Sequence, residues 1–138
     1  MEVKRRAEII QKWIDNYCNS VSFEIKSLVI GVSGGVDSSV VSTLCALTGR
    51  KTIVLSMPIK QKKNQHDLSI DHGNWLVKKF SNVKLDTINL ESIFNEFKKN
   101  MEQFNNEHGF ANSRARLRMI TLYQVAASNS GIVVGTGN

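Results

Sequence analysis

The fold of this chain is decided by the stretch LVIGVSGGVDSSVVSTL, residues 28–44. An apolar run comes first, two adjacent glycines with serines around them follow, and apolar residues then resume at helical spacing. This order predicts a buried strand, a tight turn and a helix that begins at the turn. In open α/β sheets, ligands bind beyond the carboxyl ends of the strands, and the first strand-to-helix turn is the favoured place for phosphate. We therefore expect an anion-binding turn here.

The residue types in this turn suit a pyrophosphate. Gly34 and Gly35 can adopt backbone angles that other residues avoid, and they let a ligand approach the main chain closely. The N–H groups at the start of the next helix have no intrahelical partner, and the helix dipole favours an anion there. Ser33, Ser38 and Ser39 add hydroxyl donors. Together these residues predict a cradle for pyrophosphate.

Two common phosphate-binding motifs do not match this turn. A Walker A loop needs GxxxxGK[ST], but the turn has no lysine, and a dinucleotide fingerprint needs GxGxxG, whereas the spacing here is GxxGG. Asp37 would be repelled by polyphosphate oxygens unless a cation lay between them, so we interpret it as a Mg²⁺ ligand. The alternative is a plain helix start, because Asp and Ser are also good capping residues.

The rest of the chain alternates between helical and strand patterns. Apolar residues recur at helical spacing over residues 3–21, with a second row (Ile9, Trp13, Cys18) that suits either core packing or contact with a partner chain. Strands are expected at 27–32, 52–57, 83–90 and 131–136. Helices are expected from Val36 to a stop at Gly49, over 67–80, along a phenylalanine-rich face ending near Gly109, and over 112–128.

This alternation predicts an α/β fold, a parallel sheet with helices on both faces, in a single domain over residues 1–138. The chain stops at GTGN, directly after the fourth expected strand, where such folds normally continue into a loop and a helix. We therefore expect a domain that is truncated at its C-terminal end.

Composition limits the classes of function. The chain has 18 basic and 12 acidic residues, a net charge of +6 that suits an anionic ligand. The basic segment 60–66 carries no aromatic residues, so nucleic-acid binding is not expected. Cys18 and Cys45 lie among apolar neighbours, which favours free thiols in a reducing compartment. No apolar stretch approaches the roughly 20 residues of a membrane span, so we expect a cytoplasmic protein.

SGGVDSS resembles the PP-loop of the ATP pyrophosphatases, which cleave ATP between its α and β phosphates and adenylate an oxygen of a second substrate. The motif alone does not choose among GMP, asparagine and NAD synthetases and tRNA-modifying enzymes. The resemblance implies a Rossmann-like fold of the adenine-nucleotide alpha-hydrolase type, with Mg²⁺ at Asp37. The ATP contacts that it implies in this turn are Gly31, Val32, Ser33, Gly34, Gly35, Val36, Asp37, Ser38 and Ser39.

The segment ANSRARLRMITLYQVAASNSGIVVGTGN, residues 111–138, resembles the signature of ammonia-dependent NAD synthetases. On a helix, Arg116 and Tyr123 are two turns apart and share a face that Asn112 extends. The resemblance implies that these three residues contact deamido-NAD in a site formed across a homodimer, and that Thr136 contacts ATP. Arg114 and Arg118 are interpreted as surface or interface charges.

The reaction implied by this resemblance has two steps. The nicotinic acid carboxylate of deamido-NAD attacks the α-phosphorus of ATP and releases pyrophosphate, and ammonia then converts the adenylate to NAD and AMP. Free ammonia is the expected donor, because the chain has no room for a glutamine amidotransferase domain. In the family a second acidic metal ligand follows the GTGNK motif, beyond residue 138.

Two other functions stay open on the sequence. The chain is alternatively a different adenylating PP-loop ligase, or a non-catalytic fragment that binds nucleotide or dimerises. The three histidines, His66, His72 and His108, are not spaced for joint metal binding, and we interpret them as structural or surface residues.

Overall fold

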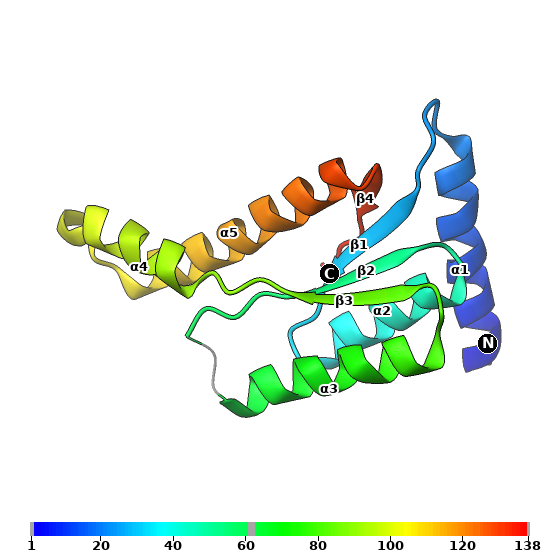
Figure 1. Ribbon diagram of the computed structural model, residues 1–138, viewed down its shortest axis with the longest axis horizontal. Helices are drawn as coiled ribbons and strands as arrows, with labels where there is room; N and C mark the ends of the chain where they lie inside the picture. Colours follow the sequence, from blue (N-terminus) through cyan, green and yellow to red (C-terminus); the bar gives the residue numbers. More distant parts are fainter. Residues whose placement is uncertain (1, 61–62, 138) are drawn as a thin grey trace.

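A computed structural model describes residues 2–60 and 63–137. In these residues four parallel strands form one sheet in the order β3-β2-β1-β4, and helices connect them (Figure 1). The predicted parallel α/β fold is confirmed. The elements in chain order are α1 (Val3–Ser20), β1 (Ser27–Gly31), α2 (Val36–Leu47), β2 (Thr52–Ser56), α3 (Lys63–Lys79), β3 (Val83–Thr87), α4 (Glu91–Asn100), η1 (Glu102–Phe104), α5 (Glu107–Ser128) and β4 (Gly131–Val133).

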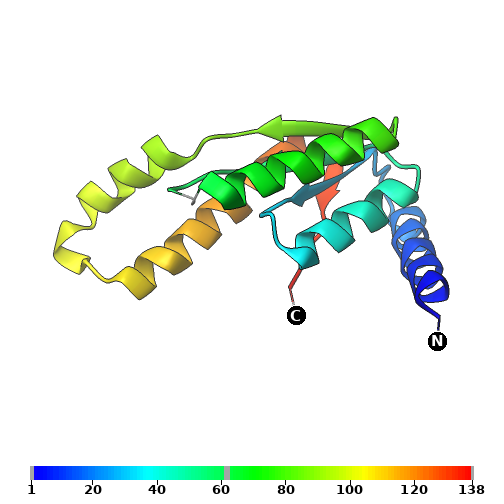
Figure 2. The same ribbon diagram turned by 90° about the horizontal axis from the view of Figure 1, so that it is seen from below.

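The sheet is covered on both faces, as Figure 2 shows. Helices α1, α2 and α3 cover one face, where Leu28 and Ile30 of β1 point. Helix α5 covers the other face, where Val29 packs with Phe94 and Phe110. Successive residues of a strand point to opposite faces, so an apolar run without alternation is what a doubly covered strand requires. Helix α4 and the first half of α5 project together beyond the sheet.

Helix α2 buries a different face from the one that its apolar spacing predicts. Val36 and Val40 are 74% and 52% exposed, whereas Ser38, Ser42 and Ala46 are buried. Small side chains let a helix backbone approach a sheet closely, and the hydroxyls of the two serines are hydrogen-bonded inside the fold. Val36, Val40 and Leu47 of the expected apolar row are therefore exposed to solvent. Only Leu44 of that row is buried.

The helices between β3 and β4 also differ from expectation. The helix predicted to end near Gly109 ends at Asn100, and α5 begins at Glu107 rather than Asn112. The reason is a cap that the spacing did not reveal: the Asn106 side chain accepts a hydrogen bond from the Gly109 N–H at 2.8 Å. Gly109 thus lies in the first turn of α5. Helix α3 likewise begins at Lys63, four residues before the expected start.

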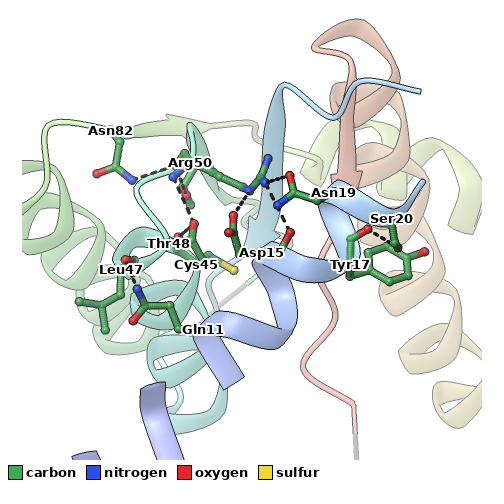
Figure 3. A network of polar contacts seen from close by, with 11 residues as sticks. Gln11, Asp15, Tyr17, Asn19, Ser20, Cys45, Leu47, Thr48, Arg50 and Asn82 are labelled. Atoms are coloured by element: carbon green, nitrogen blue, oxygen red, sulfur yellow. Dashed lines mark hydrogen bonds and ion pairs between the residues drawn. The ribbon is translucent and has the colours of Figure 1, made fainter. Parts of the chain in front are cut away.

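Polar contacts attach helix α1 to the end of α2 and to the loop between α2 and β2 (Figure 3). Arg50 Nε donates to Asp15 Oδ1 at 2.7 Å, and Arg50 Nη2 donates to Asn19 Oδ1 at 2.8 Å. Gln11 Nε2 donates to the Leu47 carbonyl at 2.7 Å. The predicted helix is confirmed, but only Ile14 and Cys18 of α1 are buried, and the Trp13 and Tyr17 rings stack on its exposed side.

Two further observations concern the cysteines and the helices of the described residues. Cys18 and Cys45 are both free and buried, and burial raises the pKa of Cys45 to about 12, with the neighbouring Cys18 adding to the shift. None of the helices in residues 2–60 and 63–137 combines the length and apolar character that crossing a membrane demands.

Candidate functional site

The glycine turn between β1 and α2 is shaped by close contact with the start of α3. Gly34 has φ +87°, a conformation that residues with a Cβ atom rarely adopt, and an added Cβ would lie 2.7 Å from the Gln65 carbonyl oxygen. Gly35 precedes α2, and no side chain of residues 2–60 or 63–137 caps the helix. The first N–H groups of α2 are therefore available to an external acceptor.

The serines hold this turn in shape. The Gly35 N–H donates to Ser33 Oγ at 3.2 Å, the Ser33 N–H donates to Ser38 Oγ at 3.2 Å, and Ser39 Oγ donates to the Gly35 carbonyl at 2.8 Å. We expected these hydroxyls to be donors to a ligand; the hydrogen bonds show that they also organise the loop. Ser38 is buried, while Ser33 is exposed at the surface of the turn.

A cavity of about 430 Å³ opens beside the turn. Four parts of the chain line it: the end of β1 with the turn, the residue after β2, one face of α5, and the end of β4 with the segment after it. Predicted ATP contacts from both ends of the sequence, Ser33 and Thr136, share this cavity with Tyr123. The full lining is Gly31, Val32, Ser33, Ser38, Met57, Ala115, Arg118, Met119, Leu122, Tyr123, Val133, Val134, Gly135, Thr136 and Gly137.

The wall contributed by the C-terminal segment depends on where β4 ends. A strand was expected to run to Thr136, but the ladder with β1 stops at Val133, and the Val134 N–H makes one last hydrogen bond to the Val29 carbonyl at 2.9 Å. The chain then leaves the sheet, so Gly135 and Thr136 turn toward the cavity rather than continuing the strand.

Asp37 lies in the first turn of α2 and is exposed. Within residues 2–60 and 63–137 it forms no ion pair, and no group of three or more His, Cys, Asp or Glu side chains is placed to hold a metal. Mg²⁺ is commonly held by one or two carboxylates together with substrate phosphates. One free carboxylate beside the glycine turn therefore fits Mg²⁺ that arrives with a nucleotide, and does not fit a metal held by the protein alone.

The three residues predicted to bind deamido-NAD lie along the exposed side of α5. Asn112 and Arg116 line a groove of about 300 Å³ between α4 and α5, with Phe94 and Phe97 on its other wall. Arg116 also shares a shallow surface hollow with Tyr123. The structure thus brings the three residues to one face, as their spacing predicted, and only Tyr123 also reaches the cavity beside the glycine turn.

Arg118, predicted to be a surface or interface charge, lines that cavity. Its Nε donates to the Met57 carbonyl at 3.0 Å, and burial, with a further contribution from Arg114, lowers the pKa of its guanidinium. Arg114 instead lies over the Phe94 ring, 5.4 Å from its centroid. The sequence held a signal that Arg118 lies beside the buried side of the helix. Ala115, Met119 and Leu122 form an apolar row at helical spacing, and Arg118 adjoins this row.

His72 has a structural contact, as expected. Its Nε2 is 2.9 Å from Ser42 Oγ, its ring stacks on Trp75, and burial lowers its pKa. This contact joins α3 to α2, the helix that follows the glycine turn.

The comparisons with known proteins agree in one family. The NAD synthase family model matches residues 6–138. The NH(3)-dependent NAD(+) synthetase of Finegoldia magna is 33% identical over 140 residues, covering 100% of this chain and 55% of that protein. Among the solved structures that match the whole chain is the NMN synthetase from Francisella tularensis, with a TM-score of 0.88, 28% identity and 56% of that chain covered. Another is the NH3-dependent NAD synthetase from Campylobacter jejuni, with a TM-score of 0.86, 27% identity and 58% of that chain covered. The chain spans about half the length of these proteins. It belongs to the NAD synthase family.

Proposed function

We propose that this protein takes part in the ATP-dependent amidation of deamido-NAD to NAD, with ammonia as the nitrogen donor and with AMP and pyrophosphate as the other products. The observation that carries the proposal is the shared cavity, in which the glycine turn, Thr136 and Tyr123 meet although they are distant in the sequence. Family membership supports the same reaction class.

The residues of the turn suit the first step of this reaction. The nicotinic acid carboxylate is itself the nucleophile, so the protein needs no activated serine or cysteine. What it must supply is positioning and stabilisation of the charge that develops on the departing pyrophosphate. The unpaired N–H groups at the start of α2 and the backbone around Gly34 and Gly35 are suited to that role. Ammonia then attacks the acyl carbon of the adenylate and displaces AMP.

Asp37 is the residue that we assign to Mg²⁺ in this proposal. Bound Mg²⁺ would neutralise charge on the ATP phosphates. Asp37 is exposed and free of ion pairs within the described residues, so it can reach a metal bridged to phosphate without losing a structural contact.

The exposed face of α5 is proposed as the deamido-NAD site and as part of a homodimer interface. Asn112, Arg116 and Tyr123 offer an amide, a guanidinium and an aromatic ring to a dinucleotide. Ile120, between them, is 66% exposed, and Ile93 of α4 is 55% exposed. Exposed apolar side chains that cluster on one face favour a protein contact there.

A mononucleotide acceptor is the second candidate. The Francisella tularensis protein that superposes with a TM-score of 0.88 is described as an NMN synthetase. The chemistry at the carboxylate is the same for both acceptors, so the glycine turn does not separate them. The groove beside Asn112 and Arg116 is the part of the structure that would contact the second nucleotide of deamido-NAD, which a mononucleotide acceptor lacks.

The test is pyrophosphate release by the purified 138-residue chain with Mg²⁺–ATP and ammonium. Deamido-NAD, nicotinic acid mononucleotide or no acceptor is added in parallel. Release that depends on deamido-NAD supports the proposal, and release that depends only on the mononucleotide supports the second candidate. Binding of ATP by calorimetry without release in any arm indicates the non-catalytic nucleotide-binding fragment. Release without either acceptor means that water takes the adenylyl group, which counts against both acceptors.

A further inference from the structure

We propose that Arg118 supplies the positive charge that binds a phosphate group of ATP in the cavity beside the glycine turn. The inference rests on the proposed ATP-binding function and adds to it a residue that the sequence predicts to be a surface or interface charge. Arg118 would act beside the backbone N–H groups of the turn, which carry no formal charge.

The lining of the cavity carries one positive charge. Of its lining residues within the described parts of the chain, Arg118 alone carries a charged side chain; the rest are glycines, apolar residues, hydroxyl residues and a tyrosine. Ser33 and Ser38 of the turn line the same cavity. An anion bound against the turn would therefore share the cavity with this guanidinium and with no carboxylate.

The orientation of Arg118 is set by β2. Its Nε donates to the carbonyl of Met57, the residue directly after that strand, at 3.0 Å. A guanidinium has five N–H donors in a rigid plane, and Nε uses one of them. Within residues 2–60 and 63–137 the terminal nitrogens form no hydrogen bond or ion pair that meets ordinary distance limits. The anchored Nε leaves the planar fork free for a phosphate.

The electrostatics of the site point the same way. A partly buried cation without an anionic partner is costly, and native proteins usually pair such charges. Arg118 has Arg114 nearby rather than a carboxylate, and the pKa of Arg118 is lowered accordingly. A bound phosphate would compensate this charge, and charge-assisted bonds from arginine to phosphate are among the stronger hydrogen bonds in proteins.

The two neighbouring arginines then have separate roles. Arg116 is exposed and lines the groove between α4 and α5, whereas Arg118, two positions later, lies on a different side of the helix and lines the cavity. Helical geometry turns residues two apart by about 200°, so one helix can serve two ligands.

The experiment is calorimetric titration of the whole chain with ATP, AMP and adenosine in EDTA, so that Mg²⁺ plays no part. Arg118→Gln is expected to weaken ATP and AMP by roughly ten- to a hundredfold and to change adenosine by less than about threefold. Arg118→Lys should recover part of the loss, because it keeps the charge without the fork. Lys98→Gln is the control, because Lys98 Nζ lies 5.1 Å from the Phe110 ring centroid and does not line the cavity; this variant should bind all three ligands as the parent does.

Each other result counts against the inference. Equal losses for adenosine and ATP would mean that Arg118 contacts the base or supports the cavity wall. Unchanged ATP binding in Arg118→Gln, with parent-like thermal unfolding, would show that no phosphate contact exists. If the parent chain binds none of the three ligands, the proposed function fails and this inference fails with it.

Discussion

Gly34 lies against α3 so closely that a Cβ atom added to it would be 2.7 Å from the Gln65 carbonyl oxygen and 3.1 Å from Leu68 Cβ. The glycine turn is thus shaped partly by a helix that begins about 30 residues later in the chain. The positive φ of Gly34 and this contact act together, because both exclude a side chain at this position.

Gly34→Ala is therefore expected to destabilise the chain by about 2 kcal/mol or more and to abolish ATP binding. Gly49→Ala is the matched control. Gly49 also has a positive φ, +77°, but an added Cβ would meet nothing within 4 Å, so only a backbone cost of about 1 kcal/mol is expected and ATP binding should persist. Denaturant unfolding and ATP calorimetry measure both effects. Equal losses in the two variants would contradict the role of the Gln65 contact.

Asp37→Asn is expected to remove the gain in ATP affinity that Mg²⁺ brings, while ATP binding in EDTA stays unchanged or improves. Stability should fall by no more than about 1 kcal/mol, because an exposed acidic residue in a first helical turn contributes through the helix dipole alone. Glu107→Gln makes the same change in the first turn of α5 and should leave the Mg²⁺ response intact. A full Mg²⁺ response in Asp37→Asn would disprove the metal assignment.

His72 makes stability depend on pH. Burial lowers its pKa in the folded chain, so at pH values below its ordinary pKa of about 6.5 the unfolded chain binds the proton more readily than the folded one. The free energy of unfolding should therefore fall as pH drops below about 6.5 and level off below the folded pKa. His72→Gln can keep a hydrogen bond to Ser42 without titrating, and urea unfolding between pH 5 and 8 should show a flatter dependence. An unchanged slope would mean that the pH dependence of stability comes from other groups.

Arg50→Ala is expected to destabilise the chain by about 2 kcal/mol, because it removes charge-assisted hydrogen bonds to Asp15 and Asn19 that attach α1. Lys84→Ala is the comparison, since Lys84 pairs with Asp86 at 3.2 Å with both side chains exposed, and should cost at most about 0.5 kcal/mol. Thermal unfolding separates the two variants. ATP binding should survive in both, because neither residue lines the cavity.

Ile120→Glu tests the proposed dimer face on α5. If two copies meet there, a buried charge should weaken dimerisation by roughly a hundredfold, seen as a shift to monomer by light scattering over a dilution series. Val77→Glu, at a 42% exposed apolar position on α3, is the control and should not change the association state. A parent chain that is monomeric at every concentration would contradict the interface.

The local pattern of the sequence was sufficient for much of this structure. The apolar run of β1, the glycine turn and the start of α2 are where residues 28–44 place them, because a doubly covered strand and a glycine turn leave strong local signals. The spacing of Asn112, Arg116 and Tyr123 likewise placed them along one side of α5.

Tertiary packing decided the rest. The buried face of α2 is set by how closely Ser38 and Ser42 let the helix approach the sheet, which hydrophobic spacing cannot express. The position of Arg118 depends on β2 ending beneath α5, so that the Met57 carbonyl can fix its side chain. By itself, the sequence determined where the glycine turn lies between a strand and a helix, since backbone freedom and helix start are local properties. Only the tertiary structure decided that Arg118 lines the same cavity as that turn, because the two lie on elements that are distant in the sequence.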